Sequence, residues 1–142
     1  MPNHCKNEIT ITGNVETIEK IKNTIVDYDN HENGFVPSFL EFLNPIGEWN
    51  YDKAVEEWGT KWPIYDVDDI VIEPERISFS FDTAWAPPLN AYEKGEERHN
   101  IKINARYIEH GTCFAGGYED GADYDVDYND NYQTWVKAPI SF

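Results

Sequence analysis

Residues 5–28 read CKNEITITGNVETIEKIKNTIVDY and predict the strand and helix that open the fold. Over residues 5–12 apolar and polar side chains alternate, which is typical of a half-buried β-strand. Gly13 and Asn14 follow and supply a turn and a side chain that can cap a helix. Over residues 15–28 apolar side chains recur at spacings of three and four, so we expect an amphipathic helix there.

The rest of the chain adds further strands and one more helix. Residues 29–63 contain Asn-Gly, Pro and Gly breaks, so we expect an insertion with short helical pieces lying across the core. Strand patterns follow at residues 64–73, 76–85, 100–109, 112–119 and 122–128, and a proline pair introduces a short helix at residues 88–98. This order predicts an α+β fold of the ferredoxin-like split βαβ type, with two helices on one face of an antiparallel sheet and a C-terminal β-hairpin extension.

Composition favours one packed domain over residues 1–142, with an acidic extension over residues 118–142. The chain contains seven Phe, nine Tyr and five Trp, which an unfolded acidic segment would lack. Cys5 and Cys113 are too few for a disulfide scaffold, and no stretch is apolar enough for a membrane span or a signal peptide. We therefore expect a protein of a reducing cytosol.

The charge of the chain is strongly one-sided. Eleven Lys and Arg stand against 27 Asp and Glu, which gives a net charge of −16. Such a surface repels phosphate polymers, so we expect neither direct nucleic-acid binding nor membrane binding. It attracts basic surfaces, and proteins that handle nucleic acids are the largest class that carry one. The alternative is that the charge only keeps a small protein soluble.

The most acidic stretch is EDGADYDVDYNDN, residues 119–131. Read as a strand, it places aspartates on one side and tyrosines on the other. The aspartate side could face basic residues of a partner, while the tyrosines add contact area. The expected partner-binding residues in this stretch are Glu119, Asp120, Asp123, Asp125, Asp127 and Asp130, with Tyr124 and Tyr128.

A second acidic concentration lies between residues 66 and 75, at Asp66, Asp68, Asp69, Glu73 and Glu75. Residues 89–110, in contrast, carry as many basic as acidic side chains. The charge is therefore patchy, and this patchiness favours a functional acidic surface over a uniform solubility effect.

The segment WGTKW, residues 58–62, allows two interpretations. Trp58 and Trp62 are large apolar side chains, so both can belong to the core. Alternatively, either Trp can act with Lys61 as an anchor for a partner, because aromatic residues dominate binding hot spots. We include Trp58, Lys61 and Trp62 among the candidate partner-binding residues.

Patterns for metal binding and catalysis are weak. A zinc site would need to draw on His4, Cys5, His110 and Cys113, but adjacent strand residues point to opposite sheet faces. An EF-hand reading from Asp123 fails because Tyr128 and Thr134 occupy the positions of the diagnostic Gly and Glu. No nucleophile stands in a recognisable elbow, so we expect neither enzymatic activity nor a cofactor.

Four stretches together resemble a known family. They are MPNHCKN at residues 1–7, WGTKWPIYDV at 58–67, ISFSFDTAWAPP at 77–88 and YIEHGTCFAGGYEDG at 107–121. They resemble the Api-ninety-two-like proteins, small phage and plasmid proteins with a ferredoxin-like domain and no assigned activity. The resemblance implies a mobile-element protein that works in the cytosol of a bacterial host, and it brings no catalytic residues.

These observations lead to one main functional hypothesis. The chain is expected to be an acidic phage or mobile-element protein that binds and blocks a basic, nucleic-acid-handling bacterial protein. It would act as a host-defence inhibitor of the anti-CRISPR or anti-restriction type, with its carboxylates mimicking a nucleic acid. One alternative is a ferredoxin-like module that binds a small molecule or a metal. Another is an interaction module whose acidity serves solubility alone.

Overall fold

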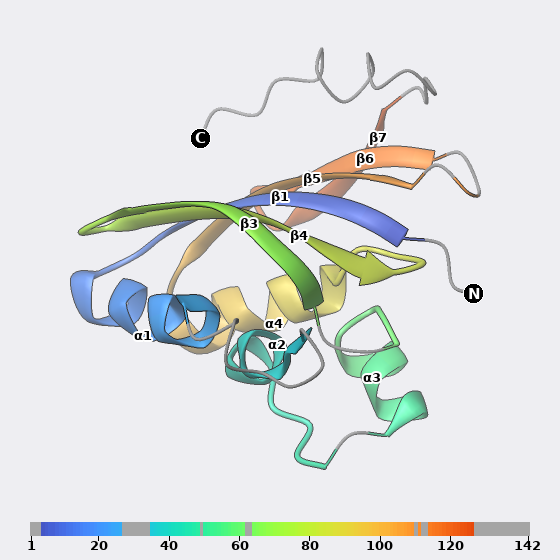
Figure 1. Ribbon diagram of the computed structural model, residues 1–142, viewed down its shortest axis with the longest axis horizontal. Helices are drawn as coiled ribbons and strands as arrows, with labels where there is room; N and C mark the ends of the chain where they lie inside the picture. The colour runs from blue at the N-terminus through green and yellow to red at the C-terminus, as the bar shows by residue number, and fades with distance from the viewer. Residues whose placement is uncertain are drawn as a thin grey trace.

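The computed structural model describes residues 4–26, 35–48, 50–61, 64–109, 111 and 114–126. Within them, seven strands form one sheet and four helices lie together on one of its faces (Figure 1). The elements in chain order are β1 (His4–Thr12), α1 (Val15–Val26), β2 (Phe35–Val36), α2 (Pro37–Leu43), α3 (Tyr51–Glu57), β3 (Ile64–Glu73), β4 (Arg76–Ala84), α4 (Leu89–His99), β5 (Lys102–Glu109), β6 (Phe114–Glu119) and β7 (Ala122–Val126).

The sheet is antiparallel, with the strand order β2-β3-β4-β1-β5-β6-β7. The first strand lies between β4 and β5, and Ile9 sits opposite both Phe79 and Ala105. The hairpins β3-β4 and β5-β6 thus flank β1, which joins the two halves of the sheet. The predicted α+β class and antiparallel sheet are confirmed, and α2 and α3 of the expected insertion join the two main predicted helices on the covered face.

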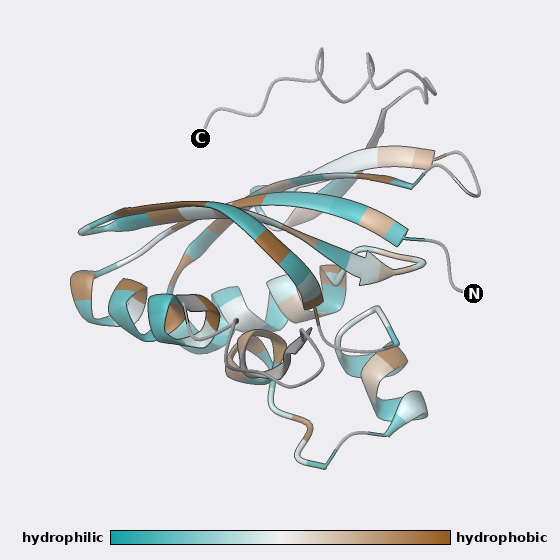
Figure 2. Cartoon of the chain, in the orientation of Figure 1, coloured by the Kyte–Doolittle hydropathy of each residue, from teal (hydrophilic) through white to brown (hydrophobic). Residues whose placement is uncertain are grey.

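The two faces of the sheet differ in chemistry because side chains alternate along each strand. On the face toward the helices, Ile9, Ile11, Phe79 and Phe81 are buried. The opposite face, here called the outer face, carries polar side chains such as Ser80 at the cross-strand positions between them. Figure 2 shows this mixture of hydrophobic and hydrophilic residues along the strands. The core therefore lies between the sheet and the helix layer.

Helix α1 forms where the sequence predicts it. The Asn14 side chain accepts a hydrogen bond from the Thr17 backbone N–H at 2.8 Å, which caps the helix start. Its apolar stripe of Ile18, Ile21 and Ile25 is buried. Burial of this stripe fixes the helix on the sheet, because an isolated helix of this length is marginal in water.

The expected insertion contains ordered elements that belong to the core. Helix α2 places Phe39 edge-on to Phe79 and Phe81 of β4, with ring centroids 5.2 and 6.0 Å apart. Leu43 of the same helix meets Gly95 of α4, where an added Cβ would lie 2.6 Å from the Leu43 side chain. The predicted short helical pieces are thus present, and α2 fills the centre of the helix layer.

Several predicted boundaries shift. The strand predicted at residues 100–109 begins at Lys102, because Asn100 ends α4 in a left-handed conformation with φ 53°. The strand predicted at residues 76–85 ends at Ala84, since Trp85 has φ 70°. Strand β2 was not predicted. No helix in the described ranges is both long enough and apolar enough to cross a membrane.

Candidate functional site: an acidic cavity on the outer face

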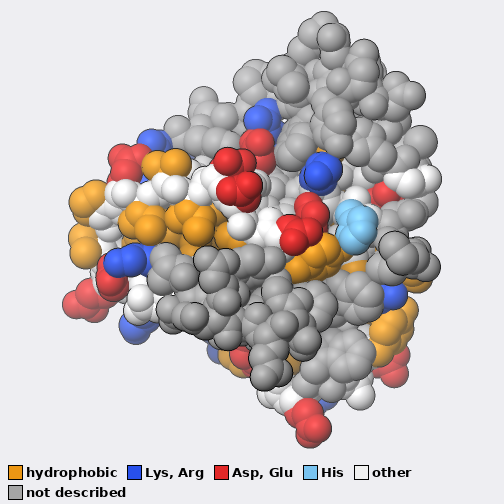
Figure 3. Space-filling view, in the orientation of Figure 1, with side chains coloured by type: hydrophobic (Ala, Val, Ile, Leu, Met, Phe, Trp, Pro, Cys, Tyr) orange, Lys and Arg blue, Asp and Glu red, His pale blue; other side chains and the backbone are white. Residues whose placement is uncertain are grey.

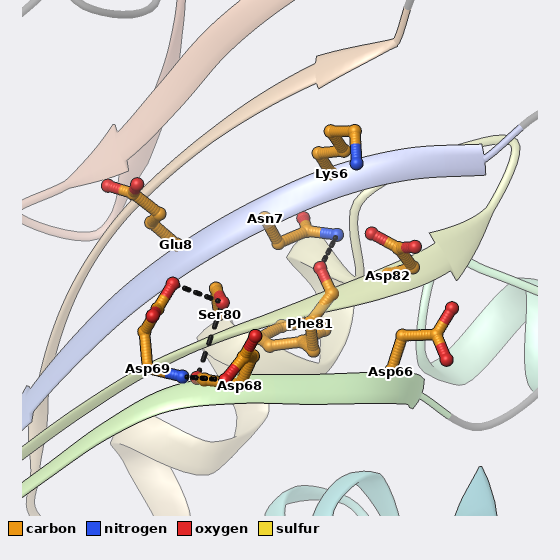
Figure 4. Close-up of a pocket in the computed structure, with 9 residues that line it drawn as sticks. All are labelled: Lys6, Asn7, Glu8, Asp66, Asp68, Asp69, Ser80, Phe81 and Asp82. Atoms are coloured by element: carbon orange, nitrogen blue, oxygen red, sulfur yellow. Dashed lines mark hydrogen bonds between the residues drawn. The ribbon is translucent and has the colours of Figure 1, made fainter. Parts of the chain in front are cut away.

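A cavity of about 420 Å³ opens on the outer face of the sheet, across β1, β3 and β4. Acidic side chains gather on this side of the molecule (Figure 3). The cavity, called the acidic cavity below, is lined by Lys6, Asn7, Glu8, Asp66, Asp68, Asp69, Ser80, Phe81 and Asp82 (Figure 4). Five carboxylates thus converge from three neighbouring strands.

The irregular shape of β3 brings its three aspartates to this cavity. Tyr65, Asp68 and Val71 lie opposite Asp82, Ser80 and Ser78, so β3 inserts one extra residue between each pair of register positions. Asp66 and Asp69 occupy the bulges with φ of 52° and 53°. Aspartate is one of the few residues that adopt this left-handed conformation readily. The bulges override the strict alternation of a regular strand and gather the acids on one side.

Hydrogen bonds hold Asp68 and Asp69 of β3 against β4. The Ser80 hydroxyl lies 3.2 Å from the Asp68 carbonyl oxygen and 3.3 Å from the Asp69 carboxylate. The Asp69 backbone N–H donates to the Asp68 carboxylate at 2.8 Å. Figure 4 shows these contacts at one end of the cavity. The carboxylates are therefore positioned before any partner arrives.

Asp82 lies at the other end of the cavity, where the surroundings disfavour its ionised form. Burial raises the pKa of its carboxyl above the ordinary value, and the neighbouring Asp66 raises it further. Lys6 and His4 act in the opposite direction and do not cancel the effect. The partly buried Asp82 thus has the exposed carboxyl of Asp66 as a hydrogen-bonded neighbour, a pairing of two acids that is unfavourable when both are ionised.

Basic side chains compensate only part of this charge. Arg106 of β5 donates from Nε and Nη2 to one carboxylate oxygen of Glu8, at 2.8 and 2.7 Å. Lys6 is the one cation among the described residues that line the cavity. The cavity accordingly keeps an excess of negative charge that can attract ammonium and guanidinium groups.

A ring pair stands beside Asp82. His4 Nδ1 and the Tyr65 hydroxyl are hydrogen-bonded, and the two rings meet edge to face. Burial raises the pKa of Tyr65, with further contributions from Asp82 and Asp66. Tyr65 therefore stays neutral and keeps its hydroxyl hydrogen. This fixed pair gives the cavity a rigid aromatic neighbour.

The described residues of the predicted acidic stretch lie at the β6-β7 hairpin, at the opposite edge of the sheet from β3. Glu119, Asp120 and Asp123 are exposed there, and Asp120 pairs with Lys102 at 3.1 Å. Asp123 lies opposite Tyr118, whereas Tyr124 lies opposite Gly117 on the outer face. The predicted alternation of aspartate and tyrosine therefore holds for the described part of β7.

Apart from Lys61, the remaining predicted residues divide into two groups. Trp58 is 2% exposed, and its Nε1 donates to the Asn44 carbonyl oxygen at 2.9 Å. It belongs to the core and is not available as a surface anchor, which corrects its assignment as a partner-binding residue. The other group comprises Trp62, Asp127, Tyr128, Asp130 and the Asp125 side chain, all outside the described residues.

Lys61 does lie beside an exposed aromatic ring, but that ring is Trp85. The Lys61 ammonium lies 4.2 Å from the centroid of Trp85, whose side chain is 49% exposed. The Thr60 hydroxyl donates to the Ala84 carbonyl oxygen at 2.9 Å and holds the two segments together. The aromatic neighbour of Lys61 among the described residues is thus Trp85, which directly follows β4.

Two of the four residues considered for a zinc site, His4 and Cys5, lie in the described part of the chain. His4 is exposed and Cys5 is buried, so these neighbours point to opposite faces as expected. Burial raises the pKa of the Cys5 thiol, which makes the thiolate hard to form. His110 and Cys113 lie outside the described residues. Within the described ranges, no group of three or more His, Cys, Asp or Glu side chains has an arrangement suited to a metal ion.

Sequence analysis missed two of the five acidic residues of the cavity, Glu8 and Asp82. Each stands among alternating strand residues and looks like an ordinary polar position. Only the register of β1 and β4 brings them beside the aspartates of β3. The sequence signal that pointed to this cavity was the cluster of acidic residues between 66 and 75, which contributes three of the five carboxylates.

Comparisons with known proteins add no relative. No protein-family model matches the chain, and neither the curated proteins nor the solved structures contain a significant match.

Proposed function

We propose that this chain is a non-enzymatic binding protein whose acidic outer face engages a basic surface of another protein. The observation that carries the proposal is the convergence of five carboxylates from three strands on one cavity. A sheet face needs only polar side chains to remain solvated. Here the acids crowd together although like charges in contact repel by about 1 to 4 kcal/mol, depending on exposure. A basic partner would relieve that repulsion.

The proposed partner is a nucleic-acid-handling bacterial protein, of the kind used in CRISPR or restriction defence. Proteins of this class hold phosphates with Arg and Lys side chains, and carboxylates fixed on a sheet can occupy the same side chains. With a net charge of −16, the chain would also be steered toward such a surface at low ionic strength. The family resemblance of the sequence supports a phage or plasmid origin and a site of action in the bacterial cytosol.

The topology supports a finer fold assignment. We infer that β1, α1, β3, β4, α4 and β5 form a ferredoxin-like unit. Their sequence order is βαββαβ, and their spatial strand order is β3-β4-β1-β5 with antiparallel neighbours. The remaining helices and edge strands would then be additions to this unit. The outer face of a ferredoxin-like sheet is the side without helices, so it is suited to binding.

The proposal is tested with two matched triple variants of the full chain. Asparagine tolerates the left-handed backbone of the β3 bulges, so replacement of their acids by amides should leave the fold intact. Each protein is immobilised and used to capture proteins from bacterial lysate at low and high salt. The test variant carries Asp66→Asn, Asp68→Asn and Asp69→Asn, and the control carries Glu16→Gln, Glu93→Gln and Glu97→Gln at exposed helix positions.

The expected result is salt-sensitive capture of a basic protein by the parent chain and by the control variant. The triple aspartate variant should lose this capture although it removes the same number of charges. Equal capture by both variants would contradict the proposal, because net charge and not the acidic cavity would then govern binding.

The acidic cavity also favours a second candidate function. Its volume of about 420 Å³ lies in the range of small-molecule sites, so the cavity favours a small cationic ligand over a metal ion, for which the described residues offer no group of three or more suitably arranged side chains. Metal analysis of protein purified without chelator tests a metal ion as the ligand of this second candidate. Stoichiometric metal that is lost in the triple aspartate variant would support the second candidate and oppose the first.

A further inference from the structure

The outer edge of β3 exposes three consecutive apolar residues. Ile70, Val71 and Ile72 are 38%, 54% and 43% exposed. Among the described residues, β2 is the strand that pairs with this edge, and it reaches only Tyr65 and Ile64 at the far end. Figure 3 shows hydrophobic side chains gathered beside the acidic ones on this side of the molecule. A strand edge of this composition is a template for pairing with another chain.

The hairpin geometry decides which backbone groups face outward. Glu73 pairs with Arg76 across a two-residue turn, so these residues form a hydrogen-bonded pair. The pair of Ile72 and Ile77 is then the non-hydrogen-bonded type, and the backbone groups of Ile72 point away from β4. Ile72 thus offers its N–H and C=O groups at the edge.

Side chains along this edge form an acidic-apolar-acidic pattern. Val71 lies opposite Ser78 on the outer face, between Asp69 and Glu73. Asp69 contacts Ser80, which places its carboxylate on the same face. Glu73 pairs with Arg76 at 2.8 Å, but both side chains are exposed, and such pairs contribute little. The glutamate can therefore exchange Arg76 for another cation.

The charges argue against a second copy of this chain as the occupant. Antiparallel pairing of two β3 edges about Val71 would place Asp69 of each copy opposite Glu73 of the other. Like charges directly opposite each other destabilise a strand pair. The chain as a whole, at −16, also repels its own copies.

We propose that the Ile70–Ile72 edge binds an extended segment of a partner protein as an added antiparallel strand. The segment presents apolar residues to the three apolar positions and Lys or Arg to Asp69 and Glu73. This inference deepens the proposed function and rests on it, because the proposed function assigns a positive charge to the partner. It adds that the basic partner supplies a strand next to the acidic cavity, so backbone hydrogen bonds join the ionic contacts.

A synthetic peptide containing the segment Lys-Val-Thr-Val-Arg serves as the probe, and Glu-Val-Thr-Val-Glu is its matched control. Backbone amide resonances of the full chain are followed by NMR while peptide is added to about 1 mM, a concentration that detects even a dissociation constant in the millimolar range. The expected result is chemical-shift change centred on the amides of residues 70–73 with the basic peptide alone. No change there, or an equal change with both peptides, would overturn the inference.

Two variants separate this edge from the acidic cavity. Val71→Lys keeps every backbone N–H and C=O group. It should lower the affinity for the basic peptide about tenfold, because it places a cation between Asp69 and Glu73. Ile72→Pro removes an outward N–H and should have a similar effect, provided that its circular dichroism matches the parent. If both variants bind the peptide as the parent does, the edge is not the site.

The outcomes also distinguish this inference from the proposed function. Lysate capture that depends on Asp66, Asp68 and Asp69 but survives Val71→Lys would refute strand addition and leave the proposed function standing. Self-association that Val71→Lys abolishes, measured by sedimentation, would identify a second copy as the occupant and refute a heterologous strand. Loss of capture in both the triple variant and Val71→Lys would support both proposals.

Discussion

Replacement of Asp82 by Asn should make the protein more stable at neutral pH and a weaker binder. Asp82 is half-buried in the acidic cavity, where burial and Asp66 raise its pKa. At pH 7 its ionised form therefore opposes folding. Asparagine has nearly the same size and no charge, so Asp82→Asn removes the repulsion without creating a void.

The size of the gain follows from the contacts of Asp82. Two like charges about 4 Å apart repel by ~1 kcal/mol in water and by ~4 kcal/mol in the lower dielectric near a protein surface. Asp82 is partly open to solvent, and Lys6 and His4 offset part of the repulsion. We therefore expect Asp82→Asn to raise the free energy of unfolding by about 0.5 to 1 kcal/mol at pH 7, on the scale measured for partly exposed charge pairs.

The gain should depend on pH in a defined direction. Because the pKa of Asp82 is raised in the folded state, the folded chain binds the proton more tightly than the unfolded chain. The free energy of unfolding of the parent protein thus falls as pH rises from the ordinary aspartate pKa, near 3.9, through the raised pKa of the folded state. The difference between Asp82→Asn and the parent should be small at about pH 3 and complete at pH 7.

Urea unfolding followed by circular dichroism at both pH values measures the difference directly. A variant that is no more stable than the parent at pH 7, or whose advantage is the same at both pH values, would refute the assumed electrostatic strain. A matched Ser80→Ala variant controls for simple changes in the cavity lining, since it alters no charge.

Three further predictions concern the scaffold, and thermal or urea unfolding tests each of them. Trp58→Phe should cost about 2 kcal/mol, because it leaves the buried Asn44 carbonyl without its donor; a loss under 0.5 kcal/mol would contradict a structural role for this bond. Gly95→Ala should cost about 1 kcal/mol despite the better helix propensity of alanine, since the added Cβ would lie 2.6 Å from Leu43, and a more stable variant would show that α2 yields easily. Asn100→Ala should cost about 1 kcal/mol while Asn100→Gly stays near the parent, because the residue has φ 53°; equal effects would exclude backbone strain as the cause.

Local periodicity was sufficient to predict the first strand, the first helix and the α+β class. Alternation over β1 and the three-four spacing over α1 are properties of neighbouring residues, so they can be read without knowledge of the fold. The insertion was harder to interpret. Its breaks predicted short helices, but the depth of α2 in the core depends on Phe39 meeting Phe79 and Phe81, which lie 40 and 42 residues further along the chain.

Sequence alone also determined that the protein is acidic and that Asp66, Asp68 and Asp69 form a concentration of charge. Only the tertiary structure decided that Glu8 and Asp82 join them, because the register between strands sets which residues meet across a sheet. The same holds for Trp58, which is buried in the core and bonded to the Asn44 carbonyl oxygen fourteen residues earlier in the chain. Charge and periodicity belong to the chain itself, whereas a binding site is a set of distances that exists only after the strands have paired.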